Sequence, residues 1–281
     1  MDWQQLSQQV VGEGAAIETA FGNKPLVYAD YTASGRAYAP IESFIQQRVL
    51  PFYANTHSES SLTGRQTNHL REEARDTIRR SLNAGPEHAV IFCGTGATAA
   101  INKLIDLLEL RHETEQRTVV FIGPYEHHSN ELPWRESAVE LVVIPLDAEG
   151  AMDLQVLEKQ LASYQGKARI LASFSAASNV TGLKTNTTAV GDLVHRYGGD
   201  VFWDYAAAAP YVGIDVSDKD AVFISPHKFL GGPGTPGLLV VRRSLLHNQI
   251  PALPGGGTVS FVAPDFHHYL EDCEHREEGG T

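Results

Sequence analysis

Short apolar runs rich in β-branched residues alternate with amphipathic stretches along most of the chain after residue 88. Seven of these runs are predicted to be strands, at residues 89–92, 118–123, 140–145, 169–174, 200–205, 221–225 and 237–243. Most of them are apolar at successive positions, which is typical of strands buried on both faces between two layers of helices. The pattern therefore predicts a sheet in the interior of the molecule.

Helical periodicity occupies the segments between these strands. Apolar residues recur every three or four positions in stretches that begin near residues 97, 154 and 189, and a further helix is predicted over 69–82. Because strand and helix alternate, we expect an α/β fold with a mainly parallel, seven-stranded sheet between helix layers. Ligands of such sheets bind at the carboxyl ends of the strands, so the residues that follow each strand are the first candidates for chemistry.

Composition narrows the classes of protein that the chain can represent. The 281 residues include 22 basic and 34 acidic side chains, and the formal net charge of -12 disfavours binding to nucleic acid. The first residues lack an apolar signal region, and no apolar run reaches the roughly 18 residues of a membrane span. We therefore expect neither a signal peptide nor a membrane-spanning helix. Cys93 and Cys273 are the chain's cysteines, too few for a disulfide framework, which predicts a cytoplasmic protein.

The segment after the first predicted strand is rich in small residues and leads into a helix. It comprises Gly94, Thr95, Gly96 and Ala97. Backbone N–H groups at a helix N-terminus favour an anion such as a phosphate. With Ala99, the segment also fits the G-x-G-x-x-A fingerprint of dinucleotide sites, and a plain strand-to-helix turn is a third interpretation.

Polar side chains follow the second and fourth predicted strands. Glu126, His127 and His128 come after the second strand, and this group favours either a metal site or an imidazole that lies over an aromatic ligand. Adjacent side chains on a loop diverge and a metal needs further ligands, so we predict no metal here, and a polar surface loop is the other alternative. Asn179 follows the fourth strand within a loop of small residues.

An acid and a lysine follow the fifth and sixth predicted strands. Asp204 ends an apolar stretch, where a buried carboxylate requires a cation, a donor or a metal unless it only caps the next turn. Ser225, His227 and Lys228 precede a glycine-rich turn. A lysine that is desolvated in such a place has a lowered pKa and is suited to form a Schiff base.

In chain order, these candidates match the needs of pyridoxal 5'-phosphate. This cofactor requires a phosphate cradle, a flat group against its ring, a donor near its phenolic oxygen, an acid at its pyridine nitrogen and a lysine at its aldehyde. The motifs GTGATAAIN, EHHSNELPW, SNVTG, WDYAAA and SPHKFLGGPGTPG together resemble the class V aminotransferase family of fold-type I pyridoxal-phosphate enzymes, nearest its cysteine desulfurase branch. The similarity extends from residue 28 to REEGGT at 276–281.

The resemblance implies a role for each candidate residue. Lys228 forms the Schiff base with the cofactor and shuttles the α-proton, Asp204 keeps the pyridine nitrogen protonated, and His127 stacks on the ring. Asn179 lies near the phenolic oxygen. The residues implied to hold the phosphate are Thr95, Gly96, Ala97, Ser225, His227 and, reaching the other subunit of a homodimer, Thr281.

The resemblance also implies what the chain does and how it is organised. It points to an enzyme acting on an amino acid, most like one that converts L-cysteine to L-alanine and enzyme-bound sulfur; aminotransferases, lyases and epimerases of class V are the alternatives. We expect an N-terminal segment over 1–24, a large cofactor domain over 25–254, and over 255–281 the start of a connection to a small carboxyl-terminal domain that is largely absent. Segments 54–64 and 255–258 are the expected dimer interface.

Some positions depart from the family pattern. Ala207 stands where relatives often carry Gln or His near the phenolic oxygen. The arginine that binds the substrate carboxylate and the cysteine that takes sulfur are expected in the small domain, and neither Cys93 nor Cys273 matches that cysteine.

Two other classes of protein remain as alternatives. A dinucleotide-dependent oxidoreductase requires an acid at the end of the next strand, about 20 residues past the glycines, whereas the nearest acids, Glu113 and Glu115, precede that strand. It also leaves Asp204 and Lys228 without a role. The second alternative is a binding protein that keeps this fold but catalyses no reaction.

Overall fold

The predicted strands form one central sheet in the computed structural model, which describes residues 2–112 and 115–280. The strands are β3 (His88–Cys93), β4 (Thr118–Ile122), β5 (Glu140–Val143), β6 (Arg169–Ser175), β7 (Asp200–Asp204), β8 (Ala221–Ile224) and β9 (Gly237–Arg242). Their order across the sheet is β3-β9-β8-β7-β6-β4-β5, and β9 alone runs antiparallel, to both β3 and β8. The prediction of a mainly parallel, seven-stranded sheet is confirmed. The strand β5 is only half-buried because it lies at the edge.

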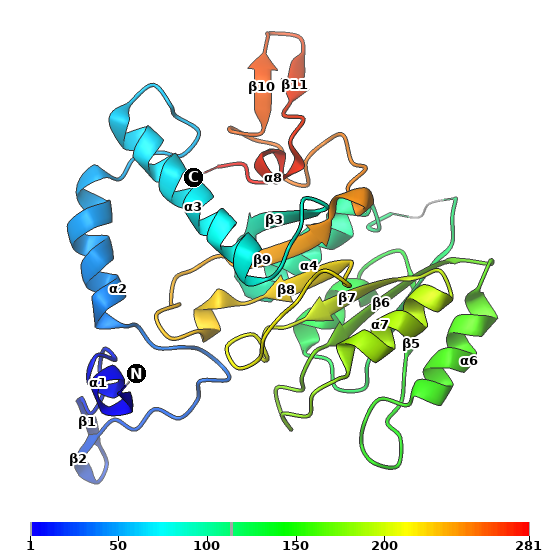
Figure 1. Cartoon of the computed structure of the whole chain (residues 1–281), viewed down its shortest axis with the longest axis horizontal. Coiled ribbons are helices and arrows are strands. Elements are labelled where there is room, and N and C mark those ends of the chain that lie inside the picture. The colour runs from blue at the N-terminus through cyan, green and yellow to red at the C-terminus, as the bar shows by residue number, and fades with distance from the viewer. Residues whose placement is uncertain (1, 113–114, 281) are drawn as a thin grey trace.

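Helices cover both faces of this sheet, as the alternation of patterns predicts. On one face, α4 (Gly96–Leu107) and α5 (Leu132–Arg135) pack into an apolar core with Ile91, Phe202 and Phe223. On the other face, α6 (Leu154–Tyr164), α7 (Thr187–Arg196) and the end of α3 (Leu62–Ser81) pack against a second core. Figure 1 shows α3 and α7 on the near side of the sheet and α4 on the far side.

The helix α3 begins earlier than its hydrophobic pattern predicts, at Leu62 instead of residue 69. Its first turns carry polar residues without an apolar stripe, so periodicity gives no sign of them. The start is set by Ser61, whose hydroxyl accepts a hydrogen bond from the Gly64 N–H at 3.0 Å. A local cap therefore adds two turns that the amphipathic pattern does not show.

The N-terminal elements lie to one side of the sheet (Figure 1). They are α1 (Trp3–Gln8), the hairpin of β1 (Ala16–Thr19) and β2 (Gly22–Pro25), and α2 (Ala39–Phe44), which continues as a π turn over 45–49 and a 3-10 turn over 50–52. Apolar side chains of the α2 segment, among them Phe44, Leu50 and Phe52, are more than half exposed. None of the described helices is both long enough and apolar enough to cross a membrane.

The C-terminal part begins with a hairpin of β10 (Val259–Val262) and β11 (His267–Tyr269), which projects from the body, and ends after α8 (Cys273–Arg276). Three buried glutamates, which we call the carboxylate clip, hold this part against the body: Glu274 and Glu278 at β3, and Glu277 at Lys103 of α4. Glu274 accepts a hydrogen bond from the Val90 N–H at 2.6 Å, and Glu278 accepts one from the Phe92 N–H at 2.5 Å. These two carboxylates occupy the free edge of β3, where another strand would otherwise pair.

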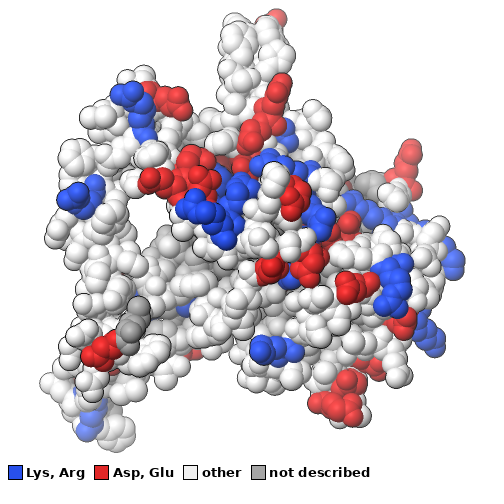
Figure 2. Space-filling model, viewed as in Figure 1, with Lys and Arg blue, Asp and Glu red and all other residues white. Residues whose placement is uncertain are grey.

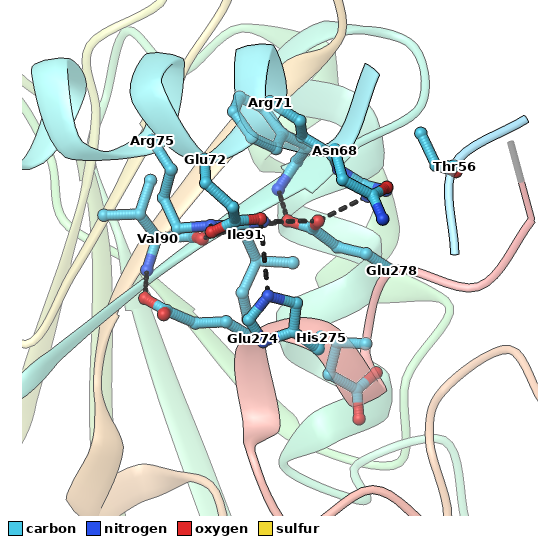
Figure 3. A network of polar contacts seen from close by, with 12 residues as sticks. Thr56, Asn68, Arg71, Glu72, Arg75, Val90, Ile91, Glu274, His275 and Glu278 are labelled. Carbon is cyan, nitrogen blue, oxygen red and sulfur yellow. Dashed lines mark hydrogen bonds and ion pairs between the residues drawn. The ribbon is translucent and has the colours of Figure 1, made fainter. Parts of the chain in front are cut away.

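Each glutamate of the clip also has a cationic partner. Arg75 donates to both oxygens of Glu278, each at 2.8 Å, and Figure 3 shows Arg71 reaching the same carboxylate. The ion pairs are those of Arg71 and Arg75 with Glu278, Arg79 and Arg243 with Glu274, and Lys103 and Arg276 with Glu277. Because these charges and backbone groups satisfy one another, the clip is a closed structural network.

Candidate active site at the carboxyl ends of the strands

A cavity of about 550 Å³ lies where the carboxyl ends of the central strands meet. It brings together every predicted site residue that the structure describes. These lining residues are Thr95, Gly96, Ala97, His127, Asn179, Asp204, Ser225, His227 and Lys228. The remaining predicted residue, Thr281, lies outside the described residues, as does Glu113.

The turn from β3 into α4 forms one wall of the cavity. Gly96 has a φ of +60°, a conformation that favours glycine, and a Cβ atom there would lie 3.0 Å from Ser225 Oγ. The Ala97 N–H donates to Ser225 Oγ at 2.8 Å, which ties the end of β8 to the start of the helix. The first-turn N–H groups of a helix attract anions, so this wall is suited to a phosphate.

The imidazole of His127 lines the cavity and is held by its own turn. The backbone N–H of Ser129 donates to His127 Nδ1 at 3.1 Å, so in the neutral ring the proton is on Nε2. The Ser129 hydroxyl lies 3.0 Å from the same nitrogen and accepts from Thr98 Oγ1 at 2.7 Å. This chain of contacts connects the imidazole to the first turn of α4.

Asp204 and Lys228 are the charged pair of the cavity. Asp204 is 5% exposed, and its side chain accepts one hydrogen bond from the described residues, from the Ala206 N–H at 2.8 Å. Burial raises the pKa of Asp204, against the effect of that hydrogen bond and of the Lys228 charge. Burial lowers the pKa of Lys228, which Asp204 opposes, and it also lowers the pKa of His227 with help from the Lys228 charge. A larger fraction of Lys228 is thus a neutral amine, the nucleophilic form.

The donor set of this cavity fits pyridoxal phosphate. The turn at Gly96 provides backbone N–H groups and Ser225 a hydroxyl on one wall. The buried Asp204 carboxylate has no salt bridge from any described side chain. A protonated pyridine nitrogen is the kind of cation that such a carboxylate favours. Asn179 and Ala207 also line the cavity, and Ala207 brings no polar group to it.

Other lining residues were not among the sequence predictions. They are Asp30, Thr32, Ala33, Thr98, Ser129, Ser175, Ala177 and Ala206. Thr98 and Ser129 lie inside the motifs named above, but their roles depend on a contact between the first turn of α4 and a 3-10 turn 31 residues further along the chain. Asp30 and Thr32 come from a segment with no periodic signal.

The structure adds no described residues in support of a metal site or a dinucleotide site. The described part of the chain contains no group of three or more His, Cys, Asp or Glu side chains placed to hold a metal ion. Glu115 comes before β4, at the opposite end of that strand from the cavity, so it cannot act as the ribose-binding acid of a dinucleotide site.

Comparison with known proteins decides the family. The model of the family described as aminotransferase class-V matches residues 27–281. The chain belongs to this family. A probable cysteine desulfurase of Staphylococcus epidermidis is 30% identical over 278 residues, which are 97% of this chain and 65% of that relative. One from Halalkalibacterium halodurans is 28% identical over 271 residues, 94% of this chain and 65% of the relative.

Solved structures of cysteine desulfurases share the fold. The apo structure of a cysteine desulfurase from Thermococcus onnurineus superposes with a TM-score of 0.83 at 26% identity, over 100% of this chain and 67% of that one. The cysteine desulfurase CsdA from Escherichia coli has a TM-score of 0.78 at 24% identity, over 100% of this chain and 68% of its own, and shows the fold alone. The chain thus spans about 65% of the length of the curated relatives above.

Proposed function

We propose that the chain binds pyridoxal 5'-phosphate in this cavity and acts on an amino acid, most like a cysteine desulfurase. The observation that carries the proposal is the meeting of Lys228, Asp204 and His127 around one cavity that also contains the Gly96 turn. Membership of the class V family and the names of the relatives support the same cofactor and reaction.

The cofactor, when bound, supplies an aldehyde that captures amines and a ring that accepts electrons from the substrate Cα. The residues of the chain would place it there. Thr95, Gly96, Ala97, Ser225 and His227 would hold the phosphate, and Asn179 would contact the phenolic oxygen. The imidazole of His127 would cover one face of the ring.

Two side chains would manage the protons. The Asp204 carboxylate would accept a hydrogen bond from the pyridine N–H and so keep that nitrogen protonated. Lys228, as a neutral amine, would hold the cofactor's aldehyde carbon through Nζ, and Nζ, when free, would accept the proton from the substrate Cα. The low exposure of Asp204 and the lowered pKa of Lys228 suit these tasks.

Neither described cysteine is placed for sulfur transfer. Cys93 is 5% exposed, and burial raises the pKa of its thiol to about 12, so it is a poor nucleophile. Cys273 accepts a hydrogen bond from Arg243 at 3.0 Å, and burial raises its pKa as well. Neither residue lines the cavity, so the proposal assigns the described residues the steps up to removal of the α-proton.

We infer that two copies of the chain form a homodimer in the cytoplasm, with segments 54–64 and 255–258 at the interface. Within one copy, His57 Nε2 lies 2.8 Å from the Gly280 carbonyl oxygen, and a Cβ on Gly257 would lie 2.6 Å from the His57 ring. Both predicted interface segments therefore lie beside the residue before Thr281. The α2 segment also exposes apolar side chains, and its surface carries few charges in Figure 2, so it adds surface suited to a partner.

The cofactor is tested by titrating the purified chain with pyridoxal phosphate. The visible absorbance of a Schiff base is expected for the wild type and for a Lys184→Ala control, whose lysine lies on a loop outside this cavity. Lys228→Ala should abolish that absorbance, and borohydride reduction followed by peptide mass spectrometry should locate the cofactor on Lys228. A wild type that shows no such absorbance at saturating cofactor contradicts the proposal.

The substrate is tested on the loaded protein. Incubation with L-cysteine and a thiol reductant should yield alanine and sulfide in equal amounts. Transfer of the amino group to a keto acid, or loss of amino-acid chirality without sulfide, would instead assign the chain to another class V activity.

A further inference from the structure

Glu126, which directly precedes His127, places its carboxylate at the centre of four hydrogen bonds. Oε1 accepts from the Ser175 N–H at 2.9 Å and from the Gly123 N–H at 3.2 Å. Oε2 accepts from Ser175 Oγ at 2.6 Å and from Asn130 Nδ2 at 2.7 Å. One side chain thus joins the ends of β4 and β6 to the turn that carries the imidazole.

The direction of these hydrogen bonds is fixed by the groups behind them. Asn130 is fully buried, and its Oδ1 accepts from Ser173 Oγ at 2.6 Å and from Trp134 Nε1 at 3.3 Å. Its amide nitrogen must therefore point to Glu126, and two of the other donors are backbone N–H groups that cannot accept. Position 126 therefore requires a side chain in which both terminal atoms accept hydrogen bonds.

The same network reaches Asp204. Ser175 and Asp204 are opposite each other in the register of β6 and β7, and the Ala176 N–H donates to the Asp204 carbonyl at 2.9 Å. Burial raises the pKa of Glu126 to about 7, and the neighbouring Asp204 charge contributes. Two carboxylates without a salt bridge from any described cation are therefore linked through Ser175, and one of them, Asp204, lines the cavity.

We propose that Glu126 is a positioning residue of the cofactor site, which fixes the height of the His127 imidazole over the ring and the place of Asp204 at its nitrogen. The inference rests on the proposed function, since it concerns how the chain holds pyridoxal phosphate. Glu126 itself does not line the cavity and touches no reacting atom.

Glu126→Gln is the direct test, because the variant keeps the shape but puts an amide N–H₂ where Asn130 already presents one. We expect the affinity for pyridoxal phosphate, measured by quenching of protein fluorescence, to fall about tenfold or more. The visible circular dichroism of the bound cofactor should also change, because it reports the asymmetry of the contacts around the ring. Glu131→Gln, in the same turn, removes an exposed ion pair with Arg135 and should leave both readouts unchanged.

A swapped pair separates positioning from general damage. Glu126→Gln combined with Asn130→Asp restores a donor opposite an acceptor and should return the affinity and the dichroism to near the wild-type values. A double variant no better than Glu126→Gln, or a Glu126→Gln variant that binds like the wild type, overturns the inference. A wild type that binds no pyridoxal phosphate overturns the proposed function instead, so the two failures are distinguishable.

Discussion

Two groups of wholly or partly buried carboxylates lie at different places on the same sheet, and they differ in how their charge is balanced. The carboxylate clip, beside β3 and α4, has a cation for each glutamate, among them Arg75 and Arg79 of α3 and Lys103 of α4. Asp204 and Glu126, at the carboxyl ends of the strands, accept hydrogen bonds from neutral groups and form no salt bridge with the described residues.

This contrast separates carboxylates that stabilise the fold from carboxylates that are placed to bind a ligand. Burying a carboxylate is unfavourable unless a cation or several donors compensate. Where the chain provides the cation, as Arg75 does for Glu278, the group serves the fold. Where it does not, and the carboxylate borders a cavity, as Asp204 does, a cationic ligand is the natural partner.

Breaking the clip should have the largest effect on stability. Arg75 is 2% exposed and is held by Glu278, Glu72 and the Val90 carbonyl, so Arg75→Leu leaves a buried Glu278 with less of its compensation. We expect the free energy of unfolding in urea to fall by about 3–5 kcal/mol. Arg80→Leu, on an exposed part of the same helix, should change it by less than about 0.5 kcal/mol.

The double variant Arg75→Leu with Glu278→Leu checks the cause of that loss. If an unbalanced charge is responsible, the double variant should recover much of the stability that Arg75→Leu loses. Equal instability of the single and double variants would show that packing of the arginine, and not its charge, holds the C-terminal part.

The same contrast explains which features the sequence predicts. The strands of the sheet and the cavity loops are predictable because buried parallel strands are continuously apolar and their ends carry the chemistry. The carboxylate clip is not predictable, because Arg75 and Glu278 are 203 residues apart and each has the sequence context of a solvent-exposed charge. The role of Glu126 is hidden for a related reason: the sequence places it beside two histidines, while its partner Ser175 is set by the register of the sheet.

The next largest effect is expected in the pH dependence of stability, which should report the protonation of Glu126 in the folded chain. Its pKa is raised from 4.5 to about 7 in the folded chain, so the folded state binds more protons than the unfolded state between these values. Stability from this group is therefore present below about pH 4.5 and is lost as the pH rises through about 7, by roughly 1–3 kcal/mol. The difference in unfolding free energy between the wild type and Glu126→Gln should show this fall from about pH 5 to about pH 8.

A carboxyl with the opposite shift is the control. Side-chain and backbone hydrogen bonds from Ser217 lower the pKa of Asp215 to about 2. The difference between the wild type and Asp215→Asn should be constant over the same pH range, because this group stays ionised in both states. A flat curve for Glu126→Gln as well would show that Glu126 is ionised throughout and that its four donors outweigh its burial.

Removing one charge from each group, without changing the shape of the side chain, compares the two groups directly, and the smallest change in stability is expected at Asp204. Glu278→Gln should lower the unfolding free energy of the cofactor-free chain by about 1–3 kcal/mol, because Arg75 and Arg71 lose their counter-charge. Asp204→Asn should change it by less than about 1 kcal/mol or raise it, since no described cation loses a salt bridge. Yet Asp204→Asn should weaken pyridoxal phosphate binding about tenfold or more, whereas Glu278→Gln should leave the cavity's own contacts intact. A loss of stability for Asp204→Asn as large as that for Glu278→Gln would mean that Asp204 serves the fold, and its carboxylate would no longer mark the place of a ligand cation.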